Sequence, residues 1–233
     1  MRSSWRLLIR ALFLLMGVAM GVAMGVAGRA SPAGSVDATF EAFRRHAHDS
    51  ALQAEIQALA RSALVEGVCG GGSVGGGRGR EPLLRRSAGV FVTLVENGHV
   101  RGCMGALEPV DGTVASDIAR ATVLAATEDH RHSPVRPSEV SRLEILVSIV
   151  GPRRQVDSLG SLAPLRLGLL VQGGGRAAVL LPGEALSPGY QVAECRRKAG
   201  IPPSVPVMMH VFPTVVFGPG QGGKNSTLRY RTP

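Results

Sequence analysis

The chain has 233 residues, of which 45% are hydrophobic and 18% charged, as expected for a globular protein with one core and some appended segments. Its formal charge is +9, but four of the 26 basic residues lie in the first thirty positions, where no acidic residue occurs. The remaining basic residues exceed the 17 acidic ones by only five, and aromatic residues that might stack on bases are few. Composition therefore does not favour nucleic-acid binding.

Residues 1–30 have the features of a secretory signal peptide. Arginines flank and precede the uncharged run 11–28, and the small-x-small sequence Gly28-Arg29-Ala30 follows it. The run is also close to the minimum length of a membrane span, and its glycines repeat the G-x-x-x-G spacing, so an uncleaved anchor is the alternative. Any membrane contact is expected through this segment only.

A third interpretation of the N-terminus is a later start. The sequence Gly-Val-Ala-Met is repeated in tandem, so that Met16, Met20 or Met24 could each be the initiator of a cytoplasmic protein. Localisation thus depends on whether residues 1–30 are translated. Residues 31–35 are interpreted as a linker, 36–217 as the folded domain, and 218–233 as a disordered tail.

The first part of the domain is predicted to be helical. Apolar residues recur at helical spacing from Val36 to Glu66, which indicates one long helix or two shorter ones. The glycine-rich stretch 67–80 lacks the lysine and hydroxyl positions of a phosphate-binding loop, so an inserted linker is expected there.

Strands and one further helix pair follow. A hairpin is predicted from the β-branched run 89–94, the Asn97-Gly98 turn and residues 99–101. Helices are predicted over 114–128, with Thr113 as N-cap, and over 190–199. Further strands are predicted over 143–150, 165–171, 177–181 and 207–217, the last confined by Pro213 to an edge or a bulge. Hairpins without a regular βαβ schedule predict an α+β fold with an antiparallel sheet and packed helices.

The best candidates for catalytic or binding residues lie at the far end of this hairpin, in Arg101-Gly102-Cys103-Met104-Gly105. Strand alternation places Arg101 and Cys103 on one face, where the guanidinium could stabilise a thiolate. Gly102 and Gly105 would let a backbone or a ligand approach closely, which makes them candidate ligand-binding positions. A buried, inert thiol is the alternative, because free cysteine is among the most buried residue types.

Other titratable residues give weaker signals. The stretch Glu128-Asp129-His130-Arg131-His132 contains potential ligands, but its position after a helix leaves their geometry uncontrolled, so no metal site or cofactor is predicted. His99 or His210 could serve Cys103 as a base only if the fold brought either close. Three widely separated cysteines, without a C-x-x-C pair, do not indicate a disulfide framework.

Several motifs, taken in order, closely resemble the AMMECR-one domain family. They are Gly-Val-Phe-Val-Thr-Leu (89–94), the 101–105 pentad with Leu107-Glu108-Pro109, the alanine-rich helix ending in Glu128-Asp129, Leu143-Glu144-Ile145, Gly173-Gly174-Gly175-Arg176 with Leu180-Leu181-Pro182, and 198–203. The resemblance covers about 36–217 and implies a two-part α+β domain. In prokaryotes it implies protein A of the AmmeMemoRadiSam system, with a Memo-type protein and a radical SAM protein as partners.

The resemblance implies no defined reaction, because the biochemical activity of that family is not established. Two functions therefore stay open. One is a cysteine-dependent or redox component, in which Cys103 is the nucleophile, Arg101 lowers its pKa and Glu128 or Asp129 orients a partner. The other is a non-catalytic binding module, in which the glycine-flanked hairpin holds a protein or ligand. His130 and His132 depart from the family pattern, which weakens any metal proposal at that position.

Overall fold

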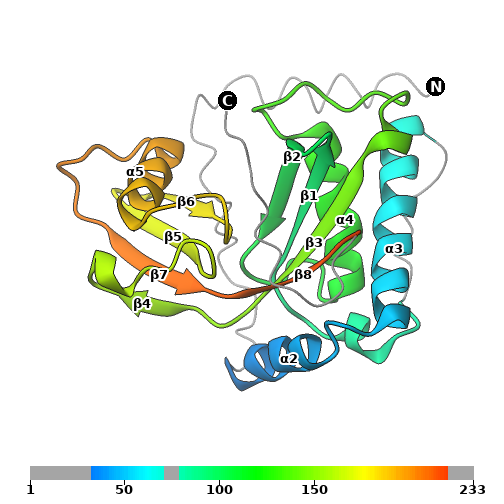
Figure 1. Cartoon of the computed structure of the whole chain (residues 1–233), viewed down its shortest axis with the longest axis horizontal. Coiled ribbons are helices and arrows are strands. Elements are labelled where there is room, and N and C mark those ends of the chain that lie inside the picture. The colour runs from blue at the N-terminus through cyan, green and yellow to red at the C-terminus, as the bar shows by residue number, and fades with distance from the viewer. Residues whose placement is uncertain (1–32, 71–78, 220–233) are drawn as a thin grey trace, which may run out of the picture.

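The structure, a computed structural model, describes residues 33–70 and 79–219. Within these ranges the chain forms two parts, each built on a four-stranded antiparallel sheet (Figure 1). The strand order is β2-β1-β3-β8 in the first sheet and β4-β7-β5-β6 in the second. The predicted two-part α+β fold with antiparallel strands is confirmed.

The helices are α2 (Ala33–Arg45), α3 (Ser50–Cys69), α4 (Val114–Thr127) and α5 (Pro188–Ala199), with short 3-10 helices η1 (Pro82–Arg85), η2 (Val140–Arg142) and η3 (Leu159–Ser161). The strands are β1 (Val90–Glu96), β2 (His99–Ala106), β3 (Glu144–Val150), β4 (Arg154–Val156), β5 (Gly168–Gly173), β6 (Arg176–Leu180), β7 (Met208–Phe212) and β8 (Thr214–Phe217).

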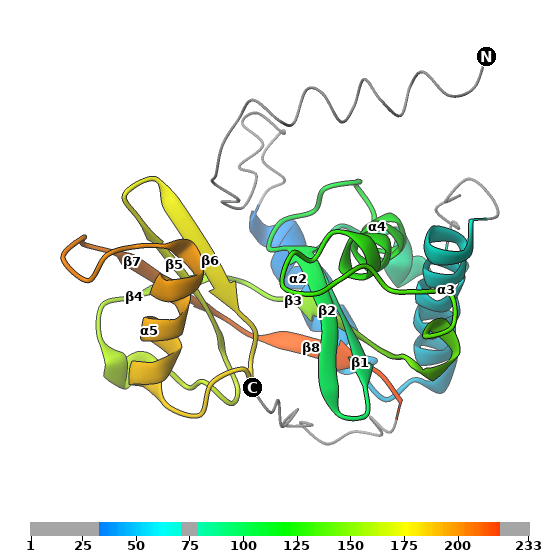
Figure 2. The same ribbon diagram turned by 90° about the horizontal axis from the view of Figure 1, so that it is seen from above.

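The first half, which contains the sheet β2-β1-β3-β8, buries one face of that sheet against helices α3 and α4 (Figures 1 and 2). Alternate residues of β1 and β3 enter this core: Val90, Val92, Leu94, Ile145, Val147 and Ile149. Helix α4 begins at Thr113, whose hydroxyl accepts from the Ser116 amide, as predicted. The buried alanines of α4 let its backbone lie close to the strands, and to Gly102 in particular.

The predicted helical segment 36–66 consists of two helices, α2 and α3. The second begins at Asp49, whose carboxylate accepts from the Ala51 and Leu52 amides, and ends at Gly70 with φ of 68°. Helix α3 therefore continues to Cys69, inside the stretch predicted as an insertion. Residues 1–32, 71–78 and 220–233, which include the predicted signal peptide, most of the predicted insertion and most of the predicted tail, lie outside the described residues. In the part of the chain that the structure does describe, no helix is both long and apolar enough for a membrane span.

The second half has its own core between α5 and the second sheet. Helix α5 is capped by the Ser187 hydroxyl at its start and by left-handed Gly200 at its end. Strand β5 begins at Gly168, three residues later than predicted. The reason is local: the amides of Arg166 and Leu167 both donate to the Ala163 carbonyl and form a turn there.

The two halves meet at two adjacent chain crossings. The predicted single strand 207–217 is divided at Pro213, so that β7 belongs to the second sheet and β8 is an edge strand of the first. This corrects the prediction of one continuous strand, and the proline marks the crossing because it has no amide for a ladder hydrogen bond. The Pro213 carbonyl instead accepts from Gly151, which lies in the other crossing, at 2.9 Å.

A small apolar cluster also joins the halves, and we call it the junction. Its buried members are Val150, Leu181 and Phe212, against which Phe91, Cys103, Leu107 and Val179 pack. The cysteine of the hairpin therefore lies where the two halves touch.

Candidate functional site

The β1–β2 hairpin forms as its sequence predicts, with one irregularity. Asn97 and Gly98 have φ of 53° and 78°, the two positive values of a type I′ turn. The register then passes from Leu94 opposite Gly102 to Val95 opposite Val100, which leaves Arg101 without a partner on β1. A β-bulge re-aims the side chains around it, so the predicted alternation between Arg101 and Cys103 does not apply.

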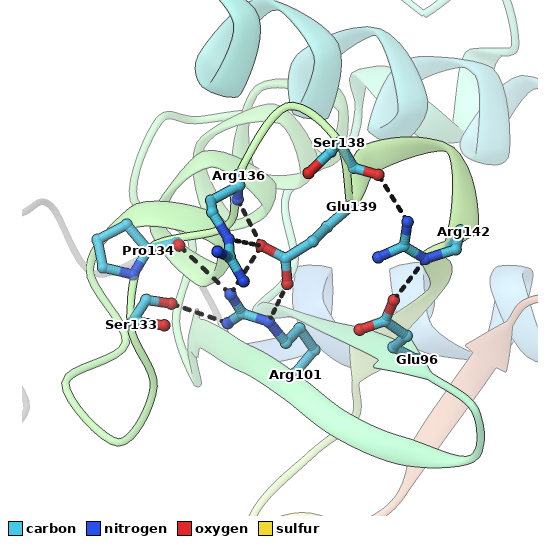
Figure 3. A network of polar contacts seen from close by, with 8 residues as sticks. All are labelled: Glu96, Arg101, Ser133, Pro134, Arg136, Ser138, Glu139 and Arg142. Carbon is cyan, nitrogen blue, oxygen red and sulfur yellow. Dashed lines mark hydrogen bonds and ion pairs between the residues drawn. The ribbon is translucent and has the colours of Figure 1, made fainter.

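The Arg101 guanidinium binds the loop between α4 and β3 (Figure 3). Its Nε donates to Glu139 Oε1 at 2.8 Å and one terminal nitrogen to Oε2 at 3.3 Å. The other contacts of the guanidinium are the carbonyls of Ser133, at 2.8 Å, and Pro134, at 3.3 Å. These bonds fix the loop on the hairpin and leave the guanidinium directed at Glu139.

Glu139 is the centre of this network. It is buried and also accepts from the Arg136 amide at 2.7 Å. The hydrogen bonds from Arg101, joined by the Arg136 amide, lower the pKa of Glu139 to about 2. Arg142 closes the loop from the far side by bonding Glu96 and the Ser138 carbonyl.

Cys103 has surroundings that favour the neutral thiol. Its sulfur accepts a hydrogen bond from the Thr93 hydroxyl at 3.2 Å, across the hairpin. Burial raises the pKa of the thiol to about 11, and the charge of Glu184 acts in the same direction. The Thr93 bond and the charges of Arg131 and Lys198 lower that pKa, but by less.

Asp129 and Arg131 hold the main chain of Cys103. Asp129 Oδ2 accepts from the Cys103 amide at 2.8 Å, and Arg131 donates to the Cys103 carbonyl at 3.3 Å. The two side chains also bind each other, at 2.9 and 2.7 Å. Burial would raise the pKa of Asp129, but the hydrogen bonds from Arg131 and from the Cys103 amide bring it to about 2.

Glu128 lies apart from this arrangement. It is the C-cap residue of α4 and is exposed. Among the residues that the structure describes, none forms a hydrogen bond or an ion pair with its side chain. Of the two carboxylates predicted at this position, Asp129 is thus the one that contacts Cys103, and a role for Glu128 stays a prediction.

The two glycines of the pentad are close to protein backbone. A Cβ added to Gly102 would lie 2.1 Å from the Ala125 carbonyl oxygen of α4, and one added to Gly105 would lie 2.2 Å from the Val90 carbonyl oxygen. Their close approach therefore serves packing within the first half. Ligand binding at Gly102 and Gly105 stays a prediction.

The histidines are not assembled into a site with Cys103. Within residues 33–70 and 79–219, no group of three or more His, Cys, Asp or Glu residues is placed to hold a metal ion. His99 and His210 make no hydrogen bond to the Cys103 sulfur, and burial lowers the pKa of His132. The three cysteines are free thiols, exposed at Cys69 and buried at Cys195.

The sequence-based predictions missed Thr93, Glu139 and Arg131 as neighbours of the pentad. The Asn97-Gly98 turn alone would place Thr93 opposite Gly102, and the bulge shifts the register so that Thr93 faces Cys103 instead. Glu139 lies 38 residues after Arg101, and no local pattern indicates that contact.

A sequence profile of the AMMECR1 family matches residues 57–217, which is most of the chain. The chain belongs to the AMMECR1 family. Relatives in this family include proteins of Thermotoga maritima, 35% identical over 127 residues, and of Methanothermobacter thermautotrophicus, 37% identical over 131 residues. Each alignment spans 52% of this chain, and they span 72% and 68% of the respective relatives.

A solved structure shows the same fold as this AMMECR1 domain. The uncharacterized protein PH0010 from Pyrococcus horikoshii superimposes with a TM-score of 0.63 and 26% sequence identity. The match covers 69% of this chain and 88% of that protein. The matched family region contains both sheets and the junction, so the residues around Cys103 all belong to the family domain.

Proposed function

We propose that this AMMECR1 domain is a non-catalytic binding module whose binding surface lies around Cys103 at the junction of the two halves. The state of the thiol carries this proposal. It is packed in an apolar cluster, accepts a hydrogen bond from Thr93 and has a pKa of about 11. A thiolate, which is the nucleophilic form, is therefore scarce near neutral pH.

The position of Arg101 supports the same proposal. In the cysteine-dependent alternative this guanidinium activates the thiol, but here it binds Glu139 and two loop carbonyls. The cations that do act on the thiol are Arg131 and Lys198, and their effect is smaller than that of burial. Cys103 is only partly buried, so the neutral state of its thiol, rather than lack of access, opposes a cysteine-dependent or redox role.

The partners we propose are a Memo-type protein and a radical SAM protein, as the resemblance to the AMMECR-one family implies. The test is a pull-down of both purified proteins by the full chain, comparing wild type with Cys103→Ala. We expect the variant to retain binding, because the thiol makes only a packing contact and one weak hydrogen bond. Failure of the wild-type chain to recover either partner would contradict this assignment.

The thiol itself can be tested by the pH dependence of alkylation, with Cys69 and Cys195 replaced. We expect the rate to rise towards a midpoint near 11. A midpoint at or below the value of a free thiol, roughly 8.5, would favour the cysteine-dependent alternative over the binding module. A Cys103→Ser variant supplies the blank for residual reactivity.

A further inference from the structure

Strand β2 is an outer strand of the first sheet, and its free edge is occupied by side chains. At Cys103 the main-chain amide donates to Asp129 and the carbonyl accepts from Arg131, at 2.8 and 3.3 Å. These are the two positions at which a neighbouring strand would place its own carbonyl and amide. The carboxylate and the guanidinium therefore substitute for a missing strand.

The two side chains form a unit that can leave the edge together. They are bound to each other by two hydrogen bonds, so each keeps a charged partner when both let go of Cys103. The Arg131 side chain is 47% exposed, whereas that of Asp129 is 5% exposed. One end of the pair is thus already in water, which lowers the cost of moving it outwards.

The second sheet has a similar feature on the same side. Its outer strand β6 lies towards the first half in both views (Figures 1 and 2). The Val179 carbonyl of β6 accepts from the Lys198 ammonium at 2.7 Å, and Val179 belongs to the junction with Cys103. Edge carbonyls from both sheets therefore meet cationic side chains at the junction.

We propose that the junction binds an extended peptide, which adds to β2 as a further strand after displacing the Asp129–Arg131 pair from Cys103. This inference rests on the proposed function and names its ligand class. A strand edge from which such side chains have been displaced can pair with another main chain, and strand addition is a common mode of peptide recognition. A single extended segment is the favoured occupant, because β2 is the outer strand that lies towards the second half (Figures 1 and 2) and Cys103 already packs against residues of that half.

The test uses the full chain and a labelled probe peptide with the β1 sequence of residues 90–96, flanked by lysines. This sequence already pairs with β2 through the opposite edge, so its side chains alternate suitably. Fluorescence polarisation is measured for wild type, Asp129→Ala and Arg131→Ala. Each variant removes one hydrogen bond to a charged group that the peptide must displace, so we expect binding about tenfold tighter or more for Asp129→Ala.

Matched controls separate strand addition from other causes. Glu128→Ala removes an adjacent exposed carboxylate and should bind like wild type. A peptide N-methylated at alternate amides keeps its side chains but loses its main-chain donors, and it should not bind. If Asp129→Ala does not fold, Arg131→Ala leaves the Asp129 bond in place and should show a smaller gain.

Equal affinity of wild type and both variants would overturn the proposal, as would binding of the N-methylated peptide. Self-association of Asp129→Ala without peptide binding would also overturn it, in favour of edge pairing between copies. A successful pull-down of the Memo-type or radical SAM protein with no peptide binding would reject strand addition alone. Peptide binding without either partner would reject only the proposed partners.

Discussion

Neighbouring residues of the pentad 101–105 serve different parts of the fold. Arg101 holds a loop through Glu139, Gly102 receives the α4 backbone and Cys103 packs into the junction. The pattern that suggested a reactive thiol therefore has a structural explanation at Arg101, Gly102 and Cys103. The charged side chains of Asp129 and Arg131 form hydrogen bonds with the main chain of Cys103 and not with its sulfur.

Gly102 has no room for a side chain. Gly102→Ala should lower the free energy of unfolding by about 1–3 kcal/mol or more, because its Cβ would meet the Ala125 carbonyl oxygen rather than a flexible side chain. Gly189→Ala in α5 is the matched control, since nothing lies within 4 Å of its added Cβ. Urea denaturation of the two variants measures the difference, and equal stabilities would contradict the packing role of Gly102.

Two buried carboxylates predict sensitivity to acid. The pKa of Asp129 and that of Glu139 are both lowered to about 2 in the folded state, from 3.8 and 4.5. A lowered folded-state pKa stabilises the protein above the unfolded value, and this stabilisation is lost as the pH falls from about 4.5 towards 2. Denaturation series over this range should show a shallower pH dependence for Asp129→Asn and Glu139→Gln than for wild type. Unchanged slopes in both variants would contradict the assignment.

Part of this site could be predicted from the sequence, and the rest could not. Cys103 and the acidic pair at 128–129 were recognisable as chemistry-bearing residues, but their contacts depend on where α4 ends. The helix stops at Thr127, so Glu128 caps it in solvent and Asp129 turns back to β2. A shift of one residue would exchange their positions, and helix ends are not fixed that closely by sequence pattern.

At the scale of elements, the loop from α4 to β3 is held mainly by arginines from outside it. Arg101 binds Glu139 and the Ser133 and Pro134 carbonyls, while Arg61 on α3 donates to the carbonyls of Val140 and Leu143, at 2.8 and 2.6 Å. A loop without regular hydrogen bonds needs such donors for its buried carbonyls. The loop therefore couples α3, β2 and β3 into one body.

The Arg101–Glu139 pair should show energetic coupling in a double-mutant cycle. Removing either partner leaves the other charge buried, so Arg101→Ala and Glu139→Ala should each destabilise by about 3–5 kcal/mol, and the double variant by less than their sum. The pair Arg197 and Glu194, of which the arginine is exposed, provides the control cycle, with an expected coupling of about 0.5 kcal/mol or less. Additive effects at Arg101 and Glu139 would contradict the role of this pair in fixing the loop.

Elements with local signals were predictable, and those set by distant pairing were not. The Asn97-Gly98 turn fixed the hairpin, and the Thr113 cap fixed the start of α4. Strand β4 has only three residues, too few for a recognisable pattern. The division at Pro213 depends on two sheets competing for one strand, and this pairing is decided by tertiary contacts rather than by local preference.

At the scale of the whole molecule, two cores are joined by a much smaller cluster. The cores of the halves are separate, and the junction has only three buried members. Two adjacent crossings, at Gly151 and Pro213, make the covalent connection. Such an arrangement allows the junction to open at lower cost than either core, and any opening further exposes the Cys103 side chain that packs against it.

Phe212 is fully buried and belongs to the junction. Phe212→Ala should destabilise the chain by about 3–5 kcal/mol and accelerate alkylation of Cys103, since the thiol loses its apolar cover. Leu169→Ala is the control: it creates a cavity in the core of the second half, outside the junction. At matched global stability, adjusted with urea, Cys103 should react faster in Phe212→Ala than in Leu169→Ala. Equal rates would show that packing of Phe212 does not limit access to the thiol, and would contradict local opening of the junction.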